Sequence, residues 1–201
     1  MEYILNYYIC YSRSFLVKKL LVTALFYATF GNCSPNYAPP PTLDSSIKQI
    51  NTPEETQQWL ETVLTYESDK FLYGKEDFWA PCGLTYQHKK GDCEDYAICA
   101  AAILREDIDL GYIITVYNSD SLKREAHAVF AYRLNGKWGI ISNDKNQFRS
   151  PKYQSLPKVL LDSIDEKYTE YMVYDYGGLD LVDGKGNLGP KMKEIGRYRL
   201  R

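Results

Sequence analysis

The segment Gly91-Asp92-Cys93-Glu94-Asp95-Tyr96-Ala97 decides the fold of this chain, and Ala126-His127-Ala128-Val129 follows it further along. Asp92 is of a type that favours the N-cap of a helix, and small or apolar residues recur at helical spacing as far as Arg105. Cys93 is therefore expected in the first turn of a helix, where unpaired backbone N–H groups and the helix dipole favour a thiolate. We interpret Cys93 as a nucleophile.

A β-hairpin is predicted to carry the matching base, His127. Residues 126–134 are rich in strand formers, Asn135-Gly136 is a strong two-residue turn signal, and residues 138–142 form the return strand. With a two-residue loop, this register places His127 opposite Asp144. A carboxylate or amide in such a position holds an imidazole in the tautomer that accepts a thiol proton.

These motifs resemble the transglutaminase-like superfamily, the papain-related cysteine enzymes that include bacterial transglutaminase-like cysteine proteases. The resemblance runs from about Phe78 to Asp144. Its marks are Phe78-Trp79-Ala80-Pro81, the Cys93 motif, His127-Ala128, Gly136-Lys137-Trp138 and Ile140-Ile141-Ser142-Asn143-Asp144. The resemblance implies an α+β fold with a papain-like/transglutaminase-like core, in which the nucleophile at a helix N-terminus packs on an antiparallel sheet that carries the base and its orienter.

One position departs from the family pattern. The third catalytic residue of the family is usually an aspartate four residues after the hairpin tryptophan, and Ser142 occupies that place here. Two neighbours are then candidates to orient His127. Asp144 is favoured by the register, whereas Asn143 has the residue type of papain-like enzymes and needs only a small β-bulge near the strand end.

The resemblance implies a thiol-dependent acyl-transfer enzyme that acts on a protein or peptide substrate. Hydrolysis of a peptide or isopeptide amide bond by Cys93, His127 and Asn143 or Asp144 is our first hypothesis, with Trp79 as a substrate-binding pocket wall. One alternative is transfer of the acyl group to an amine. The other is a catalytically inactive binding module, which Ser142 in the usual aspartate position would favour.

The N-terminal segment, residues 1–33, is predicted to direct export. Lys18-Lys19 precede an apolar run from Leu20 to Phe30, which suits a signal peptide and is too short to span a bilayer. A periplasmic, cell-surface or secreted location follows. Either the chain is cleaved after Gly31, or Cys33 is lipidated and becomes a membrane tether.

Two further segments follow the signal-like region. Residues 34–50 are Pro-rich and are predicted to form a tether without a core of its own. Residues 51–201 are assigned to the transglutaminase-like domain. Thr52-Pro53-Glu54-Glu55 at its start is a capping box with proline at the first helical position, so a helix is expected there.

The cysteines allow a second interpretation of Cys93, in which Cys82, Cys93 and Cys99 include a structural disulfide and Cys93 is not a nucleophile. In an exported protein Cys82 could form a structural disulfide with another cysteine. Cys93 and Cys99 point in different directions from one helix and cannot bridge to each other while it is intact. Cys99 is expected to be a small buried hydrophobe.

Composition argues against several other classes of function. The net charge of −2 gives no electrostatic reason to expect a nucleic-acid partner. No ligands recur at zinc spacing, so neither a metal nor another cofactor is predicted. The 19 tyrosines are interpreted as sheet packing rather than a sugar-stacking surface. The sequence carries no signal for an oligomeric state.

Overall fold

The computed structural model describes residues 47–118, 125–175 and 193–200, all within the unit Tyr37–Arg201. The predicted signal-like segment 1–33 and the tether up to residue 46 lie outside the described residues. None of the helices formed by the described part of the chain has the length and apolar character needed to cross a membrane.

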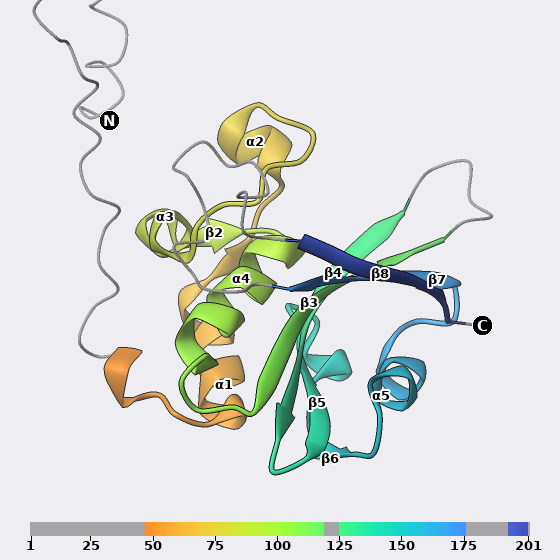
Figure 1. Ribbon diagram of the computed structural model, residues 1–201. Coiled ribbons are helices and arrows are strands. Elements are labelled where there is room, and N and C mark those ends of the chain that lie inside the picture. Colours follow the sequence, from red (N-terminus) through yellow and green to blue (C-terminus); the bar gives the residue numbers. More distant parts are fainter. Residues whose placement is uncertain (1–46, 119–124, 176–192, 201) are drawn as a thin grey trace, which may run out of the picture. The chain divides into compact units, whose positions relative to one another are not determined.

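A six-stranded antiparallel sheet forms the centre of the fold, with the strand order β6-β5-β4-β3-β7-β8 (Figure 1). Its strands are β3 (Leu110–Tyr117), β4 (Ala126–Leu134), β5 (Lys137–Ile141), β6 (Arg149–Tyr153), β7 (Glu170–Asp175) and β8 (Lys193–Arg199). A separate parallel pair is made by β1 (Thr65–Tyr66) and β2 (Lys90–Gly91). Strand β8, which the sequence analysis did not anticipate, pairs with β7 at one edge.

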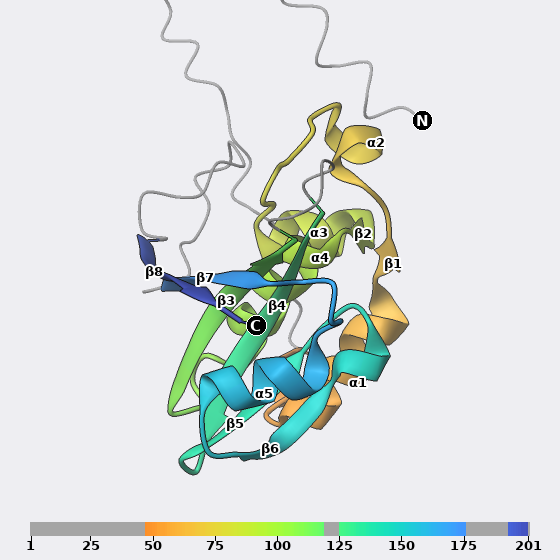
Figure 2. The same ribbon diagram turned by 90° about the vertical axis from the view of Figure 1, so that its right-hand side faces the viewer.

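Helices cover both faces of the sheet, which gives the predicted α+β fold. Their bounds are α1 (Pro53–Val63), α2 (Asp69–Tyr73), α3 (Cys82–His88), α4 (Cys93–Leu104) and α5 (Leu156–Ser163), with short 3₁₀ turns η3 (Ile47–Gln49) and η4 (Lys145–Gln147). Figures 1 and 2 show α1, α3 and α4 on one side of the sheet and α5 on the other. Each face buries its own apolar cluster.

Helix α4 forms where the sequence predicted it, with Cys93 as its first residue and Asp92 at the N-cap position. The Asp92 side chain makes no capping hydrogen bond, and the Asp92 carbonyl accepts the first hydrogen bond of the helix, from the Tyr96 N–H at 3.1 Å. Ala97, Ala100 and Ala101 are at most 1% exposed. Because alanine has no side chain beyond Cβ, these positions let α4 approach the sheet closely.

The hairpin of β4 and β5 has the predicted register. Leu134 pairs with Lys137 and Phe130 with Ile141, and Asn135 and Gly136 have φ angles of 51° and 73°, as a two-residue turn between twisted strands requires.

The ladder stops before it reaches His127, so the expected pairing of His127 with Asp144 is wrong. Strand β5 ends at Ile141, and the chain then turns into η4, whose N-cap is Asp144. The Asp144 carboxylate accepts a hydrogen bond from the backbone N–H of Asn146 at 2.9 Å. Competition from this local cap takes the chain out of the sheet.

The first helix confirms its capping box, because Thr52 Oγ1 accepts a hydrogen bond from the Glu55 N–H at 3.2 Å. Just before it, Ile47 is 5% exposed and belongs to the core under α4. The packed domain therefore already includes residue 47, within the stretch assigned to the tether. Tyr168, Tyr171 and Tyr174 are buried, as sheet packing predicts.

A disulfide joins Cys82, at the start of α3, to Cys99 in α4 with a Cα–Cα distance of 4.6 Å. The expectation that Cys99 is a plain hydrophobe is wrong, because the sequence could not show that α3 lies against this face of α4. Cys93 is the free thiol of the described residues. The bridge fixes α4, which begins with Cys93, to α3.

Candidate active site

A cleft of about 370 Å³ opens at the N-terminus of α4. The cysteine and histidine singled out in the sequence share its wall with acidic and aromatic side chains. Its lining is Tyr66, Glu76, Asp77, Trp79, Asp92, Cys93, Glu94, Thr115, Tyr117, Ala126, His127 and Ala128. The cleft thus brings Cys93 and His127 together, whereas no lysine or arginine of the described residues lines it.

Cys93 lies at this helix start, partly buried. Its Sγ donates a hydrogen bond to Oε2 of Glu94 at 3.2 Å. Burial, followed by the charge of Glu94 and this hydrogen bond, raises the pKa of Cys93 well above its ordinary value, while the Ala128 backbone N–H acts in the opposite direction. These surroundings favour the uncharged thiol.

His127, near the start of β4, uses one ring nitrogen to hold its position. Its Nε2 lies 2.8 Å from Oε1 of Gln147 and 3.2 Å from Oγ of Ser142. Because an amide oxygen only accepts hydrogen bonds, Nε2 carries the proton and donates a hydrogen bond to Gln147. Nδ1 is then the unprotonated nitrogen, which is the one able to accept a proton.

A small network fixes these two partners of the imidazole. Ser142 Oγ donates to Oε1 of Gln147 at 2.9 Å and accepts from the backbone N–H of Asp144 at 3.1 Å. The Gln57 side chain in α1 pairs with the Ser142 backbone, accepting from its N–H at 3.2 Å and donating to its carbonyl at 2.8 Å. Ser142 and Gln147 are 1% and 9% exposed, so water competes little for these bonds.

The environment of His127 favours a neutral ring. Burial lowers the pKa of His127, and the hydrogen bond to Gln147 only partly offsets this. The ring of Tyr168 stacks against the imidazole with a centroid distance of 6.3 Å and an interplanar angle of 25°. The surroundings thus favour the neutral form of both the imidazole and the thiol, and the two side chains line the same cleft.

Five carboxylates gather beside Cys93: Asp69, Asp77, Asp92, Glu94 and Asp95. Asp92, Glu94 and Asp95 lie at the start of α4, Asp69 opens α2, and Asp77 lies between α2 and α3. Their oxygens lie within 4.8 Å of one another in the groups Asp69, Asp92, Asp95 and Asp69, Asp77, Glu94. Burial and then the neighbouring Asp92 raise the pKa of Glu94 to about 10 and that of Asp69 to about 6. Burial also raises the pKa of Asp95 to about 8.

This acidic cluster has the donor set of a hard divalent cation such as Ca²⁺ or Mg²⁺, which prefers oxygen ligands. Buried oxygens Oδ1 of Asp69, Oδ1 of Asp92 and Oδ2 of Asp95 have no hydrogen-bond partner among the described residues. Such orphaned acceptors are costly unless a ligand satisfies them. The residues therefore fit a bound cation.

Two of these acids also hold the segment that carries Trp79. The backbone N–H of Phe78 donates to Oδ2 of Asp69, and the N–H of Ala80 donates to Oδ1 of Asp95 at 2.8 Å. Trp79 lines the cleft between these two anchors, 8% exposed and edge-on to Tyr174. Its role as a wall for the substrate stays a prediction.

In a comparison with protein families, residues 42–174 match the transglutaminase-like domain. That match covers both cleft residues of interest, Cys93 and His127. The chain belongs to the transglutaminase-like domain family. Its antiparallel sheet with the nucleophile helix packed on it is the architecture that this family resemblance implied. A comparison with curated protein sequences gave no significant match.

Two solved structures are similar to this transglutaminase-like domain, both of Legionella pneumophila LapG. An EGTA-treated LapG is 19% identical with a TM-score of 0.38, and the match covers 65% of this chain and 64% of that chain. A second LapG structure is 19% identical with a TM-score of 0.41, covering 77% and 72%. The chain thus spans a little under two thirds of the first LapG structure.

In the described part of this transglutaminase-like domain, neither of the two orienter candidates, Asn143 and Asp144, forms a hydrogen bond with the imidazole. Asp144 caps η4, and Oδ1 of Asn143 is buried without a hydrogen-bond partner among the described residues. The contacts to Nε2 come from Ser142 and Gln147 instead. The sequence analysis did not identify Gln147. The signal that could have found it is the spacing of a capping residue, Asp144, and a glutamine three residues later, which predicts a turn there.

Proposed function

We propose that this chain is a thiol-dependent acyl-transfer enzyme that hydrolyses peptide or isopeptide bonds. The observation that carries the proposal is that Cys93 and His127 line one cleft while Nε2 of His127 is bound to Gln147. That bond leaves Nδ1 as the proton acceptor. Membership of the transglutaminase-like family supports the same chemistry.

In the acylation step, Sγ of Cys93 attacks the carbonyl carbon of the scissile amide. Nδ1 of His127 takes the thiol proton and then transfers it to the leaving amine nitrogen as the C–N bond breaks. The product is a thioester on Cys93 and a free amine. Because thiol and imidazole both start uncharged, the proton moves during the attack rather than before it.

In the second step, water attacks the thioester carbonyl. His127 accepts a proton from this water and returns it to the departing sulfur, which releases a carboxylic acid and restores Cys93. The backbone N–H of Cys93 is unpaired at the helix start and would stabilise the oxyanion in both steps. Trp79 provides the adjoining wall for the substrate.

We assign the positioning of His127 to Gln147, with Ser142 supporting it, rather than to Asn143 or Asp144. An amide oxygen on Nε2 selects the tautomer that papain-like sites need, as an asparagine does elsewhere. Serine in the usual aspartate position is then compatible with activity, because Ser142 holds Gln147 through a hydrogen bond.

A divalent cation bound by Asp69, Asp92 and Asp95 would supply positive charge near Cys93. Without it, the carboxylates oppose formation of the thiolate, since the charges of Glu94 and Asp92 both raise the pKa of Cys93. The protein's own contribution is to place these oxygens at the helix start, where the described residues bring neither a lysine nor an arginine to the cleft.

Export of the protein remains part of the proposal. The Cys82–Cys99 disulfide supports it, because structural disulfides persist in oxidising compartments. A periplasmic, cell-surface or secreted enzyme would act on envelope proteins or peptides. Lipidation of Cys33 would add a membrane tether to the same domain.

The test is labelling of Cys93 with iodoacetamide across pH, in the wild type and in His127→Ala. The enzyme hypothesis predicts reaction below the free-thiol value of about 8.5 when a divalent cation is present, with an upward shift in the variant. An inert thiol, or one that His127→Ala leaves unchanged, would overturn it. Incubation with protein substrate and a fluorescent amine then distinguishes hydrolysis from amine transfer.

A binding module without turnover is the second candidate. The raised pKa of Cys93 favours it, because a buried thiol next to Glu94 is a poor nucleophile. A module would keep an unreactive Cys93 at every cation concentration. The labelling experiment therefore separates the two candidates directly.

A further inference from the structure

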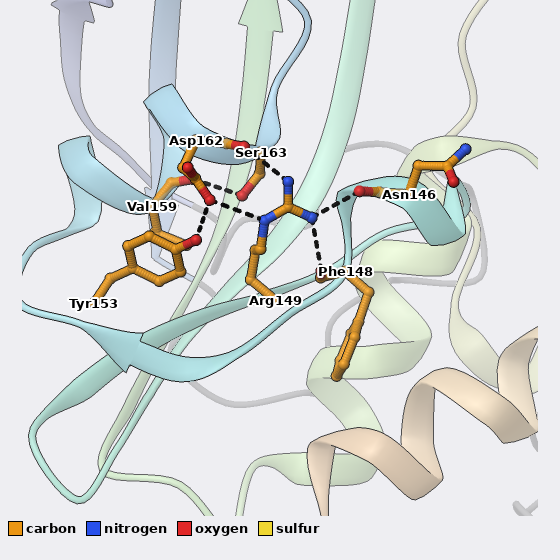
Figure 3. Close-up of polar contacts among 7 residues, drawn as sticks. All are labelled: Asn146, Phe148, Arg149, Tyr153, Val159, Asp162 and Ser163. Atoms are coloured by element: carbon orange, nitrogen blue, oxygen red, sulfur yellow. Dashed lines mark hydrogen bonds and ion pairs between the residues drawn. The ribbon is translucent and has the colours of Figure 1, made fainter.

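Arg149, the first residue of β6, lies outside the cleft yet makes an unusually complete set of hydrogen bonds (Figure 3). Its side chain is 23% exposed. The backbone carbonyl of the same residue accepts a hydrogen bond from the phenol of Tyr132 at 3.0 Å. Tyr132 is fully buried, so the strand position that carries the guanidinium is itself anchored in the core.

One nitrogen of this guanidinium binds the chain on both sides of Gln147. Nη1 donates to the carbonyl of Asn146 at 2.6 Å and to the carbonyl of Phe148 at 2.9 Å. Figure 3 shows the guanidinium between these carbonyls and α5. The two carbonyls flank the residue whose side chain accepts the Nε2 proton of His127.

The rest of the guanidinium is held by the end of α5. Nε donates to Oδ2 of Asp162 at 3.1 Å, and Nη2 donates to the Asp162 carbonyl at 2.8 Å. The same carboxylate accepts a hydrogen bond from the phenol of Tyr153. These bonds, from Tyr153 first and then Arg149, lower the pKa of Asp162 and keep it ionised. Arg149 therefore connects α5 to η4.

Turn η4, which accepts these hydrogen bonds from Arg149, has little stability of its own. Turn η4 contains three residues and is closed by the Gln147 N–H to Asp144 carbonyl bond of 2.9 Å and the Phe148 N–H to Lys145 carbonyl bond of 3.3 Å. A single 3₁₀ turn with such bonds is weak in isolation. The arginine fork binds these two carbonyls through Nη1 and Asp162 through Nε and Nη2, a geometry that lysine cannot reproduce.

We infer that Arg149 is a positioning residue that fixes Gln147, and through Gln147 the orientation of the His127 imidazole. The inference rests on the proposed role of His127 as the base. Arg149 lies on β6, which is separated by β5 from the strand that carries His127. It does not line the cleft, and no sequence motif suggested it. The Arg149 clamp comprises Asn146, Phe148, Arg149 and Asp162.

The decisive variant is Arg149→Lys, which keeps the charge and loses the fork. The readout is hydrogen exchange of the His127 Nε2–H by NMR, since the bond to Gln147 protects this proton. His127 and His88 are the two histidines of the chain, and exposed His88 serves as the internal reference. We expect exchange to become roughly tenfold faster at His127, the factor that corresponds to one net hydrogen bond, with His88 unchanged.

Labelling of Cys93 provides the functional readout. We expect Arg149→Lys to slow it, by up to roughly 100-fold, because small displacements of a catalytic group are costly. Arg133→Lys is the matched control, a half-buried arginine of β4 that lies over the Trp138 ring. Tyr153→Phe removes the phenol from Asp162 and leaves the fork in place. Both controls should behave as the wild type.

Wild-type exchange and labelling rates in folded Arg149→Lys would overturn the inference. So would an unchanged effect of Arg149→Lys on a Gln147→Ala background, because the clamp could then not act through Gln147. If Arg149→Lys fails to fold, Asp162→Asn tests the clamp from its other end, and wild-type exchange there would equally contradict it. An unreactive Cys93 in the wild type would overturn only the proposed function. The rate of hydrogen exchange at His127 would still test whether Arg149 positions Gln147.

Discussion

The amide oxygen of Gln147 accepts a hydrogen bond from Nε2 of His127 at 2.8 Å, from a turn that lies beyond the end of the β4–β5 ladder. The same oxygen accepts from Ser142 at 2.9 Å. A neutral amide in this place fixes the tautomer without adding charge. The imidazole is therefore oriented for proton transfer while its pKa remains low.

Gln147→Ala should slow labelling of Cys93 strongly while leaving the fold intact. Loss of the orienting partner costs up to about 10⁴-fold in sites of this kind, because the imidazole no longer presents one tautomer. We expect a loss of at least roughly 100-fold at pH 7. The measurement is the rate of iodoacetamide reaction at Cys93, followed by mass spectrometry.

Gln154→Ala is the matched control for this variant, because Gln154 is an exposed glutamine beyond β6. Asn143→Ala tests the sequence-based alternative in the same assay. A large loss in Asn143→Ala together with a wild-type rate in Gln147→Ala would show that Asn143 is the orienter.

Local patterns were sufficient to predict the elements that carry the nucleophile and the base. The helix at Cys93 and the hairpin at Asn135-Gly136 depend on residues close in sequence, namely caps, apolar spacing and turn chemistry. Both elements form with the expected bounds to within a residue or two. Their position side by side came from the family resemblance, since neither motif encodes the other.

Features that depend on long-range contacts could not be predicted in this way. Gln147 reaches His127 because Asp144 caps a turn after β5, a choice between local hydrogen bonding and the ladder that sequence alone does not decide. The acidic cluster forms because Asp69 packs beside the start of α4. The partner of Cys82 likewise depends on how α3 packs against α4.

The metal-free protein should lose stability as pH rises. Burial raises the pKa of Glu94 to about 10 and that of Asp95 to about 8, whereas unfolded chains have values of about 4.3 and 3.9. The folded state binds these protons more tightly, so their contribution is complete below about pH 4 and is lost as pH rises through 8 and 10. Urea denaturation in EDTA at pH 5, 7 and 9 measures this.

Glu94→Gln should flatten that pH dependence, because the amide resembles the protonated acid and does not titrate. Glu106→Gln, at an exposed glutamate after α4, should keep the wild-type slope. A metal-free wild type whose free energy of unfolding rises between pH 5 and 9 would contradict the assigned direction.

Addition of Ca²⁺ or Mg²⁺ should stabilise the protein and make Cys93 easier to ionise. Ligand at about 100 times its dissociation constant adds about 2.7 kcal/mol, which corresponds to roughly 5 to 10 °C in Tm for a domain of this size. Positive charge beside Asp92 and Glu94 also lowers the pKa of the thiol. Thermal unfolding and the pH midpoint of labelling, each with EDTA and with the cation, are the measurements.

Asp69→Asn removes a carboxylate that belongs to both carboxylate groups, Asp69/Asp92/Asp95 and Asp69/Asp77/Glu94. It should abolish the rise in Tm and the shift in the pH midpoint of labelling that the cation causes. Asp165→Asn, at an exposed aspartate after α5, should retain them. Equal Tm values with EDTA and with saturating cation would rule out the cation site.

The Cys82–Cys99 disulfide should be separable from the reactive thiol by peptide mapping. Non-reducing tryptic digestion after iodoacetamide treatment is expected to give residues 76–89 linked to residues 91–105, with one alkyl group on Cys93. Replacing both Cys82 and Cys99 by serine should cost about 3 kcal/mol, the entropy of a loop of this length. Cys93→Ser, which leaves the bridge intact, is the control. Alkylation of Cys82 or Cys99 in the native protein before reduction would contradict the bridge. If, of these three cysteines, Cys93 alone is alkylated, the result agrees with a helix α4 that is bonded to α3 and whose N-terminus is open to the cleft.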